Sequence, residues 1–432
     1  MHRVLVSDDL SAEAVKILKD AGLEVDVKVG LKPEELEAIV GGYDGLAVRS
    51  ATKVTARLLE KATRLKVVGR AGVGVDNVDL AAATRRGVVV MNTPGGSSTA
   101  VAELALAMIM SLFRHVAAAT ASVKAGRWEK KRFQGRELAG KTLGVVGIGN
   151  IGSILVDRCL AMKMRVLAYD PFISPEAAAR LGVTLTDLDG IWREADAISL
   201  HVPLTDQTRN MINAATLARM KKGAVLVNCA RGGIVDEAAL AAALASGHLG
   251  GAALDVFDAE PPPAGHPLLG LDNVVLTPHL GASTDEAQVA VALAVAEQMA
   301  QYLQAGEVTN AINVPSLPRE VLAQLGPYLP LSEKLGSLVG QLIPAGPEEV
   351  VVSVSGHLAK APTRALANKV LVGLLRHVLD TPVNDVSAPA AARERGLVLR
   401  EERAVEHRDY VSLLTVTVRG KGYRLNLDGE VR

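Results

Sequence analysis

Short apolar runs alternate with amphipathic stretches over the first ninety residues of the chain. The apolar runs have the length of strands, and the stretches between them place apolar residues near a 3.6-residue period, which predicts helices. Gly22 follows the first predicted helix and Pro33 opens the second, as expected at helix ends. This alternation favours a parallel sheet covered by helices on both faces. The predicted strands are 3–7, 24–29, 45–49, 66–69 and 88–91, and the predicted helices are 11–21, 33–40, 55–62 and 78–85.

A second alternation follows a long apolar pattern over residues 98–124, which predicts one long helix. Two prolines within residues 313–318 mark a boundary, and beyond it the pattern is that of a smaller module. We therefore predict the α/β class, with two doubly wound parallel-sheet domains and a C-terminal α+β module. The further predicted strands are 142–147, 165–170, 195–201, 224–228, 250–255, 274–277, 349–355, 412–419 and 423–427, and the further predicted helices are 151–161, 283–305 and 363–379.

Composition excludes several classes of function. Lys+Arg and Asp+Glu both number 47, so the chain lacks the basic excess that usually holds proteins to nucleic acid. Cys159 and Cys229 are the two cysteines, which rules out a disulfide scaffold and a Cys-rich zinc site, and we expect no metal. The apolar run 289–296 has eight residues, far short of the roughly 18 needed to cross a bilayer. We expect a soluble, cytoplasmic protein without nucleic-acid or membrane partners.

Gly147, Gly149 and Gly152 form a G-x-G-x-x-G between a predicted strand and a predicted helix. The first glycine makes a tight turn, the second lets the backbone approach a pyrophosphate, and the third lets helix and strand pack closely. Asp170 closes the next predicted strand, where it would accept hydrogen bonds from ribose hydroxyls and repel a 2′-phosphate. The motif therefore predicts NAD rather than NADP. The alternative is a structural glycine turn followed by a surface aspartate.

Three polar segments, 228–233, 255–262 and 277–284, begin where predicted strands end, and open α/β sheets bind ligands at that edge. Oxidation of an alcohol beside a carboxylate needs a base, a cation for the carboxylate and a hydride acceptor. His279 can act as the base, with Glu260 holding it in one tautomer, and Arg231 offers a planar fork for a carboxylate. Spacing alone also allows a surface histidine, a turn-capping glutamate and an ion-paired arginine.

Two other residues near these segments, His201 and Cys229, have side chains that could also take a catalytic role. His201 also stands at a strand end and is a rival base, although Val202 and Pro203 beside it are typical of a wall facing the cofactor. Cys229 has the residue type of a nucleophile, but we expect it to be a small buried residue under the cofactor.

These segments resemble the NAD-dependent D-2-hydroxyacid dehydrogenase family, as do residues 48–54, 69–79, 92–96 and 128–133. The resemblance covers about residues 3–315. It implies that Arg231 binds the substrate carboxylate, that Glu260 partners His279 and that His279 is the acid/base. The expected cofactor-binding residues are Gly147, Gly149, Asn150, Ile151, Gly152, Asp170, His201, Val202, Pro203, Cys229, Ala230, Arg231, Asp255, His279 and Gly281, and the expected substrate-binding residues are Arg49, Ser50, Arg70, Gly72, Val73, Gly74 and Asn92.

A phosphorylated substrate has a counterpart in two arginines. Arg49 and Arg70 each close a predicted strand, and Gly72-Val73-Gly74 could point backbone N–H groups at an anion. Two arginines suit a phosphate better than an apolar tail, the alternative being ordinary exposed arginines. In the resembled enzymes residues 130–132 reach a neighbouring subunit, so we expect a homodimer or homotetramer built on helix 98–124; otherwise these residues are a solvated charge run.

The resemblance implies a Rossmann NAD-binding domain, 98–284, inserted in a flavodoxin-like substrate-binding domain, 1–97 and 285–314. Residues 317–432 resemble the intervening, allosteric substrate-binding module of such enzymes. The expected reaction is NAD-dependent oxidation of 3-phospho-D-glycerate to 3-phosphohydroxypyruvate, towards serine. The alternatives are another D-2-hydroxyacid dehydrogenase, such as a glyoxylate or hydroxypyruvate reductase, and a non-catalytic NAD-sensing scaffold. The longest family members add a serine-binding ACT domain, and this sequence stops at Arg432 before one, through either natural absence or truncation.

Overall fold

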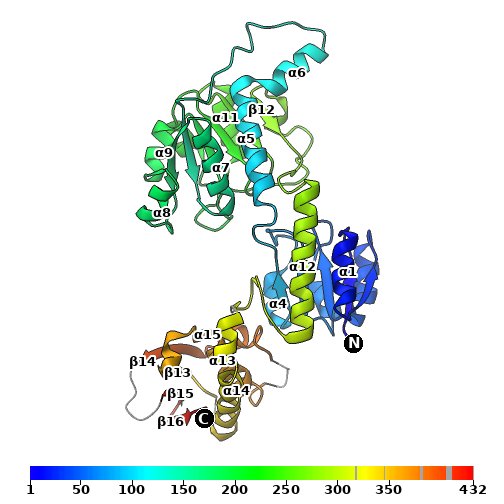
Figure 1. Ribbon diagram of the computed structural model, residues 1–432, viewed down its shortest axis with the longest axis vertical. Helices are drawn as coiled ribbons and strands as arrows, with labels where there is room; N and C mark the ends of the chain where they lie inside the picture. The colour runs from blue at the N-terminus through cyan, green and yellow to red at the C-terminus, as the bar shows by residue number, and fades with distance from the viewer. Residues whose placement is uncertain (317–318, 345, 380–382, 405–410, 432) are drawn as a thin grey trace. The chain divides into compact units, whose positions relative to one another are not determined.

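The computed structural model describes residues 1–432 apart from 317–318, 345, 380–382, 405–410 and 432. The chain forms two compact units (Figure 1). One consists of Met1–Pro94 with Val289–Arg432, and the other of Gly95–Gln288. The end of the predicted linker, residues 317–318, lies outside the described residues.

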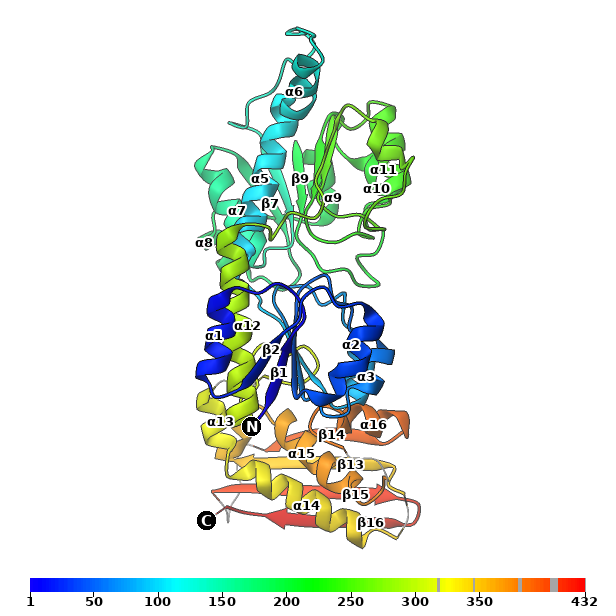
Figure 2. The same cartoon turned by 90° about the vertical axis from the view of Figure 1, so that its right-hand side faces the viewer.

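The first unit begins with five parallel strands in the order β2-β1-β3-β4-β5. Its interior strand β1 is buried on both faces, because Val4 and Val6 enter one apolar cluster and Leu5 enters another. Figure 2 shows α1 and α12 on one side of this sheet and α2 and α3 on the other. The elements are β1 (Arg3–Val6), α1 (Ala12–Asp20), β2 (Glu24–Val27), α2 (Pro33–Ile39), β3 (Gly45–Val48), α3 (Ala56–Lys61), β4 (Val67–Arg70), α4 (Leu80–Arg85), β5 (Val89–Met91) and α12 (Asp285–Ala305).

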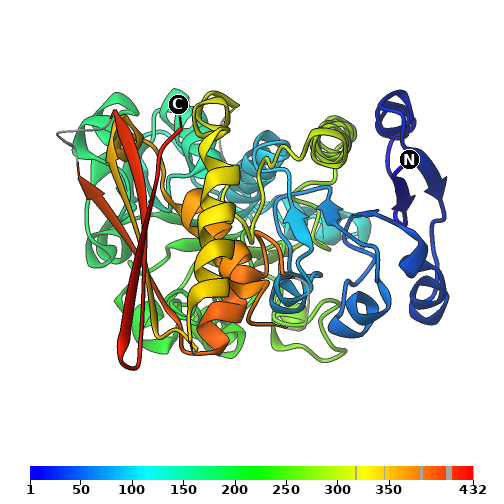
Figure 3. The ribbon, with the colours of Figure 1, turned by 90° about the horizontal axis from the view of Figure 1, so that it is seen from below.

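The same unit carries a second sheet with the strand order β14-β13-β15-β16. β13 pairs parallel with β14 and antiparallel with β15, so this is a mixed sheet. Helices α14 and α15 pack on one face of it, as seen from below in Figure 3. The elements are α13 (Arg319–Leu325), α14 (Tyr328–Leu342), β13 (Glu349–Gly356), α15 (Arg364–Leu375), α16 (Ala388–Glu394), β14 (Val398–Ala404), β15 (Ser412–Gly420) and β16 (Tyr423–Gly429).

The second unit is built on seven parallel strands in the order β12-β11-β10-β9-β6-β7-β8. The strand order reverses between β6 and β9, and such a switch point opens a crevice at the carboxyl ends of the strands. Helices cover both faces of the sheet. The elements are α5 (Ser98–Arg114), α6 (Val116–Lys124), β6 (Thr142–Val146), α7 (Asn150–Ala161), β7 (Arg165–Tyr169), α8 (Pro175–Arg180), β8 (Thr184–Leu185), α9 (Leu188–Glu194), β9 (Ala197–Leu200), α10 (Ala214–Arg219), β10 (Val225–Asn228), α11 (Glu237–Ala245), β11 (Gly251–Leu254) and β12 (Val274–Leu276).

The predicted fold class is confirmed, since two doubly wound parallel sheets and a mixed α+β module are present. The single helix predicted over 98–124 is wrong. The chain breaks at His115, which adopts a left-handed conformation with φ of 52°, and α5 and α6 meet there at a bend of 63°. No single helix in the described part of the chain is long and apolar enough to cross a membrane; the bent α5–α6 pair meets the length and composition criteria together.

Candidate active site

The glycine-rich loop after β6 has the local geometry that a dinucleotide requires. Gly147 has φ of 93°, and a Cβ there would lie 2.6 Å from the His201 carbonyl oxygen. A Cβ at Gly152 would lie 2.2 Å from the Gly147 carbonyl oxygen, whereas a Cβ at Gly149 would meet nothing within 4 Å. The outer two glycines are therefore demanded by packing, and the middle one leaves open space at the N-terminus of α7. Asn150 and Ile151 begin that helix, whose first N–H groups can bind an anion.

Asp170 joins the end of β7 to this loop. One carboxylate oxygen accepts the Ile148 N–H at 2.8 Å, and the other accepts the Phe172 N–H at 2.8 Å. The negative charge is therefore fixed beside the phosphate-binding turn. A carboxylate in this place favours a ribose with free hydroxyls and repels a 2′-phosphate, so the residues present fit NAD.

His279 and Glu260 meet directly in the second unit. The His279 Nδ1 lies 2.8 Å from Glu260 Oε2, and the other carboxylate oxygen accepts the Phe257 N–H at 3.2 Å. The two side chains remain accessible, with 52% of the histidine and 39% of the glutamate exposed. Since an ionised Glu260 accepts the Nδ1 proton, the lone pair stands on Nε2, which is the arrangement of a general base.

Asp255, at the end of β11, organises the loop that carries His279. It is fully buried, and its two carboxylate oxygens accept the Leu280 N–H at 2.7 Å and the Gly281 N–H at 2.8 Å. The Thr277 hydroxyl donates to the same group at 2.5 Å. His279 itself has φ of 54°, a left-handed conformation that is costly for a residue with a side chain. The buried carboxylate thus holds the loop in a strained shape that presents the imidazole.

The Arg231 loop packs tightly against the loop that carries Glu260. A Cβ at Gly232 would lie 1.9 Å from the Phe257 carbonyl oxygen, and the Gly233 N–H donates to Asp258 at 2.5 Å. Before it, the Asn228 side chain accepts the Ala230 N–H and donates to the Arg231 carbonyl oxygen. The three segments at neighbouring strand ends, β10, β11 and β12, are therefore one hydrogen-bonded assembly.

Sequence reasoning missed a second clamp on the same loop. Glu237, at the start of α11, accepts the Asp258 N–H at 2.9 Å through one oxygen and contacts His266 Nε2 at 2.8 Å through the other. Both side chains are nearly buried, and the His266 ring stacks edge-on against Phe257. No local sequence pattern predicts the contact between Glu237 and His266, because the two residues are 29 positions apart in the chain.

His201 and Cys229 have environments that oppose proton transfer and nucleophilic attack. Burial lowers the pKa of His201 to about 4, and its Nε2 pairs with the Ser199 hydroxyl at 2.9 Å. Burial, and then the Asp255 carboxylate, raise the pKa of the Cys229 thiol well above its usual range. His201 is therefore neutral at physiological pH and the thiol stays protonated. Val202 and Pro203 follow His201 at the carboxyl end of β9, beside the Gly147 loop.

The expected substrate-binding residues gather at strand ends in the first unit. Arg49 follows β3, where its N–H donates to Asp8 at 2.6 Å, and Ser50 comes next. Arg70 closes β4, and its guanidinium lies against Ala71 and Gly72.

The turn after Arg70 is fixed from the segment after β5. The Gly72 N–H donates to the Thr93 hydroxyl at 2.8 Å, and the Asn92 amide donates to the Val73 carbonyl oxygen at 2.5 Å. The Gly72 N–H is thus already used, and the expectation that it points at an anion is not met. Gly74 completes this turn.

Comparisons with known proteins agree with this geometry. Residues 106–281 match the family model of the D-isomer specific 2-hydroxyacid dehydrogenase NAD binding domain, and residues 324–432 match that of the D-3-phosphoglycerate dehydrogenase intervening domain. The chain is 48% identical to a D-3-phosphoglycerate dehydrogenase of Synechocystis over 97% of its own length and 76% of that protein. It is 45% identical to one of Methanocaldococcus jannaschii over 100% of its length and 82% of that protein.

A solved structure shows the same relationship. The NAD⁺-bound 3-phosphoglycerate dehydrogenase of Entamoeba histolytica is 28% identical, with a TM-score of 0.62 over 73% of this chain and 99% of that one. The chain belongs to the D-isomer specific 2-hydroxyacid dehydrogenase family, as an enzyme with NAD as its cofactor. Within that family it is similar to the D-3-phosphoglycerate dehydrogenases.

Proposed function

We propose that this enzyme oxidises 3-phospho-D-glycerate at C2 to 3-phosphohydroxypyruvate, the first step of the phosphorylated route to serine. The contact between His279 Nδ1 and Glu260 Oε2, at the edge of the sheet that carries the dinucleotide fingerprint, is the observation that carries the chemistry. Relatives with this activity in their names match the chain over nearly its whole length, which supports the choice of substrate.

The proton chemistry follows from the orientation of the imidazole. His279 Nε2 takes the proton of the C2 hydroxyl, and Glu260 stabilises the imidazolium that forms. Arg231, from the neighbouring strand end, binds the substrate carboxylate through its planar guanidinium. NAD, held by the Gly147–Gly152 loop and Asp170, supplies the hydride acceptor when bound. In the reverse direction the imidazolium returns the proton to the carbonyl oxygen.

Arg49 and Arg70 bind the phosphate group in this proposal. They end adjacent parallel strands, since Val48 pairs with Arg70 in the register of β3 and β4. Guanidinium groups match phosphate oxygens in geometry as well as charge. We accordingly assign substrate binding to residues 1–97 and 285–314, NAD binding to 98–284, and an intervening module to 317–432.

The enzyme also works as a cytoplasmic homodimer or homotetramer in this proposal, with α5 and α6 at the interface. Met110, Val116 and Val123 on these helices are 42%, 53% and 55% exposed, and Trp128 beyond them is 85% exposed. Exposed large apolar side chains on two consecutive helices are typical of a protein–protein contact. The neighbouring Lys130 and Lys131 then lie close to the subunit interface.

Substitution of the two arginines tests the phosphate assignment. Arg49→Gln and Arg70→Gln should each raise KM for 3-phospho-D-glycerate at least tenfold, a loss of about 1.4 kcal/mol or more in binding, because a neutral amide cannot pair with a phosphate. Activity on D-glycerate, which has no phosphate, should be unaffected. Arg57→Gln is the matched control, since Arg57 is exposed and pairs with Glu37. Equal losses on both substrates would show that the arginines only maintain the fold.

A further inference from the structure

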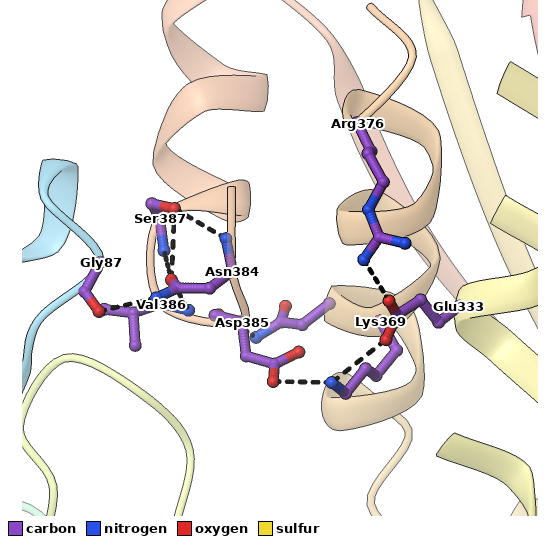
Figure 4. A network of polar contacts seen from close by, with 9 residues as sticks. Gly87, Glu333, Lys369, Arg376, Asn384, Asp385, Val386 and Ser387 are labelled. Carbon is purple, nitrogen blue, oxygen red and sulfur yellow. Dashed lines mark hydrogen bonds and ion pairs between the residues drawn. The ribbon is translucent and has the colours of Figure 1, made fainter. Parts of the chain in front are cut away.

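A cavity of about 450 Å³ lies inside the first unit, between the five-stranded sheet and the C-terminal module. Its volume falls in the range of small-molecule sites in proteins. The two sides are joined by direct contacts. The Asn384 amide donates to the Gly87 carbonyl oxygen at 2.7 Å (Figure 4). Val386 belongs to the same apolar cluster as Val89. The walls are largely apolar, and they include Val89, Val308, Val314, Leu322 and Leu329.

The lining of the cavity also includes Lys369 and Asp385, which belong to a network of ion pairs. The Lys369 ammonium lies 2.9 Å from one Asp385 oxygen and 3.4 Å from a Glu333 oxygen, and Arg376 donates to the other Glu333 oxygen (Figure 4). Burial lowers the pKa of Lys369, but hydrogen bonds to Asp385 and Glu333 outweigh it and leave the pKa raised. The lysine therefore stays charged and is held by two carboxylates.

Two acceptors in the lining of the cavity lack donors. Asn368 Oδ1 and Asp385 Oδ1 are buried, and neither has a hydrogen-bond partner among the described residues. Asn368 is only 3% exposed, and both residues line the cavity. The Asn368 amide nitrogen donates to the Asp385 carbonyl oxygen at 3.5 Å, which identifies Oδ1 as the acceptor. Buried polar groups are nearly always paired in folded proteins, so two acceptors that are unpaired among the described residues of one cavity favour a ligand that donates hydrogen bonds.

The hydrogen-bonding groups of the cavity favour a ligand that donates. Tyr302 lines the same cavity, and burial followed by the Asp385 carboxylate raises its pKa. Lys369, which also lines the cavity, neutralises Asp385 through its other carboxylate oxygen. A ligand carboxylate offers only acceptors and cannot pair with the two unpaired oxygens. A primary ammonium has three N–H donors, which is enough for both unpaired acceptors.

We propose that this cavity binds a small organic amine with an apolar body. Its ammonium group donates to Asn368 Oδ1 and Asp385 Oδ1, and its apolar body lies against the valine and leucine walls. The walls come from both the five-stranded sheet and the module, so the bound amine would stabilise the contact between them. The lining residues of the cavity include neither the NAD loop nor the residues proposed for catalysis.

Binding of three matched probes tests the proposal on the full chain. Phenethylamine, 2-phenylethanol and 3-phenylpropanoate share an apolar body and differ in the charge of the polar end. Isothermal titration at pH 7 should give saturable binding of phenethylamine, at least tenfold weaker binding of the alcohol and no binding of the carboxylate. Asn368→Leu should weaken phenethylamine at least tenfold, and Ala365→Phe should abolish its binding by filling the cavity.

Asn426→Leu is the matched control, because Asn426 lies on β16 and is not among the lining residues of the cavity. This substitution should leave the affinity for phenethylamine unchanged. Circular dichroism of each variant establishes that it is folded. Two results would overturn the proposal: no saturable binding of phenethylamine by the wild type, or equal affinity in the wild type and in folded Asn368→Leu and Ala365→Phe. These readouts do not depend on the dehydrogenase reaction, so the amine site and the proposed function fail separately.

Discussion

At the scale of single residues, the imidazole of His279 has two chemically different ends. Nδ1 is engaged by Glu260 at 2.8 Å, and Nε2 is the nitrogen able to take a proton. The pairing could be anticipated from the sequence, because Glu260 and His279 follow adjacent parallel strands, β11 and β12, whose carboxyl ends lie at one edge of the sheet. Which nitrogen would face Glu260 could not, because that depends on the left-handed backbone at His279.

Removal of the imidazole tests its role. His279→Ala should lower kcat at least 100-fold and leave the Kd for NAD within about twofold, because proton transfer typically contributes 10²–10⁴ in rate. Glu260→Gln keeps the base but cannot stabilise the imidazolium. It should therefore lower kcat less than His279→Ala does, and it should move the acidic limb of the kcat/KM profile to lower pH. Steady-state kinetics and fluorescence titration of NAD give both quantities. Undiminished turnover in His279→Ala would contradict the assignment.

His201 gives a residue-scale prediction about stability. Its pKa of about 4 in the folded chain lies below the ordinary value of 6.5, because burial disfavours the imidazolium. The unfolded chain therefore binds more protons between pH 6.5 and 4, and folding stability falls as the pH drops through this window. From pH 7 to pH 5 the loss should be about 2 kcal/mol. Urea unfolding of the wild type and His201→Gln should show a weaker pH dependence in the variant; equal dependence would mean that the ring is solvated.

At the scale of elements, the local sequence predicts a helix or strand correctly only where interactions within that segment decide its structure. The break between α5 and α6 is an example: His115 takes a left-handed conformation without the glycine or proline that usually announces such a break. The edge strand β14 is another, since its sequence VLREERA is charged and has no apolar alternation. It forms because β13 pairs with β15 along one edge and with β14 along the other, which is a tertiary effect.

The loop between β12 and α12 carries the proposed base His279, and Asp255 accepts two of its backbone N–H groups. Asp255→Asn should lower kcat at least tenfold and destabilise the second unit by about 1–3 kcal/mol, because an amide offers one acceptor oxygen where the carboxylate offers two. Kinetics and thermal unfolding give these numbers. Asp272→Asn is the control, with a side chain that is 80% exposed. Wild-type kcat in Asp255→Asn would show that the His279 loop keeps its shape without the buried charge.

At the scale of the whole molecule, the alternation of strands and helices predicted two parallel sheets and a mixed module correctly. The fingerprint could also be placed in advance, because Gly147, Gly149 and Gly152 stand at a fixed spacing between an apolar run and an amphipathic stretch. Contacts between distant segments could not be predicted, for example the pairing of Glu237 with His266 or of Asn384 with Gly87. Each of these contacts joins two segments that only the complete fold brings together, so the spacing of residues in the sequence does not predict it.

The central claim, a phosphoglycerate dehydrogenase activity, is tested most directly by comparing substrates with NAD. Initial rates of NADH formation, followed by absorbance, should be measured with 3-phospho-D-glycerate, D-glycerate and D-lactate. We predict that kcat/KM for 3-phospho-D-glycerate exceeds that for either unphosphorylated acid by at least about 100-fold, or about 2.7 kcal/mol of transition-state binding. Comparable values for D-glycerate and the phosphorylated acid, or turnover of none of the three, would contradict the proposed function.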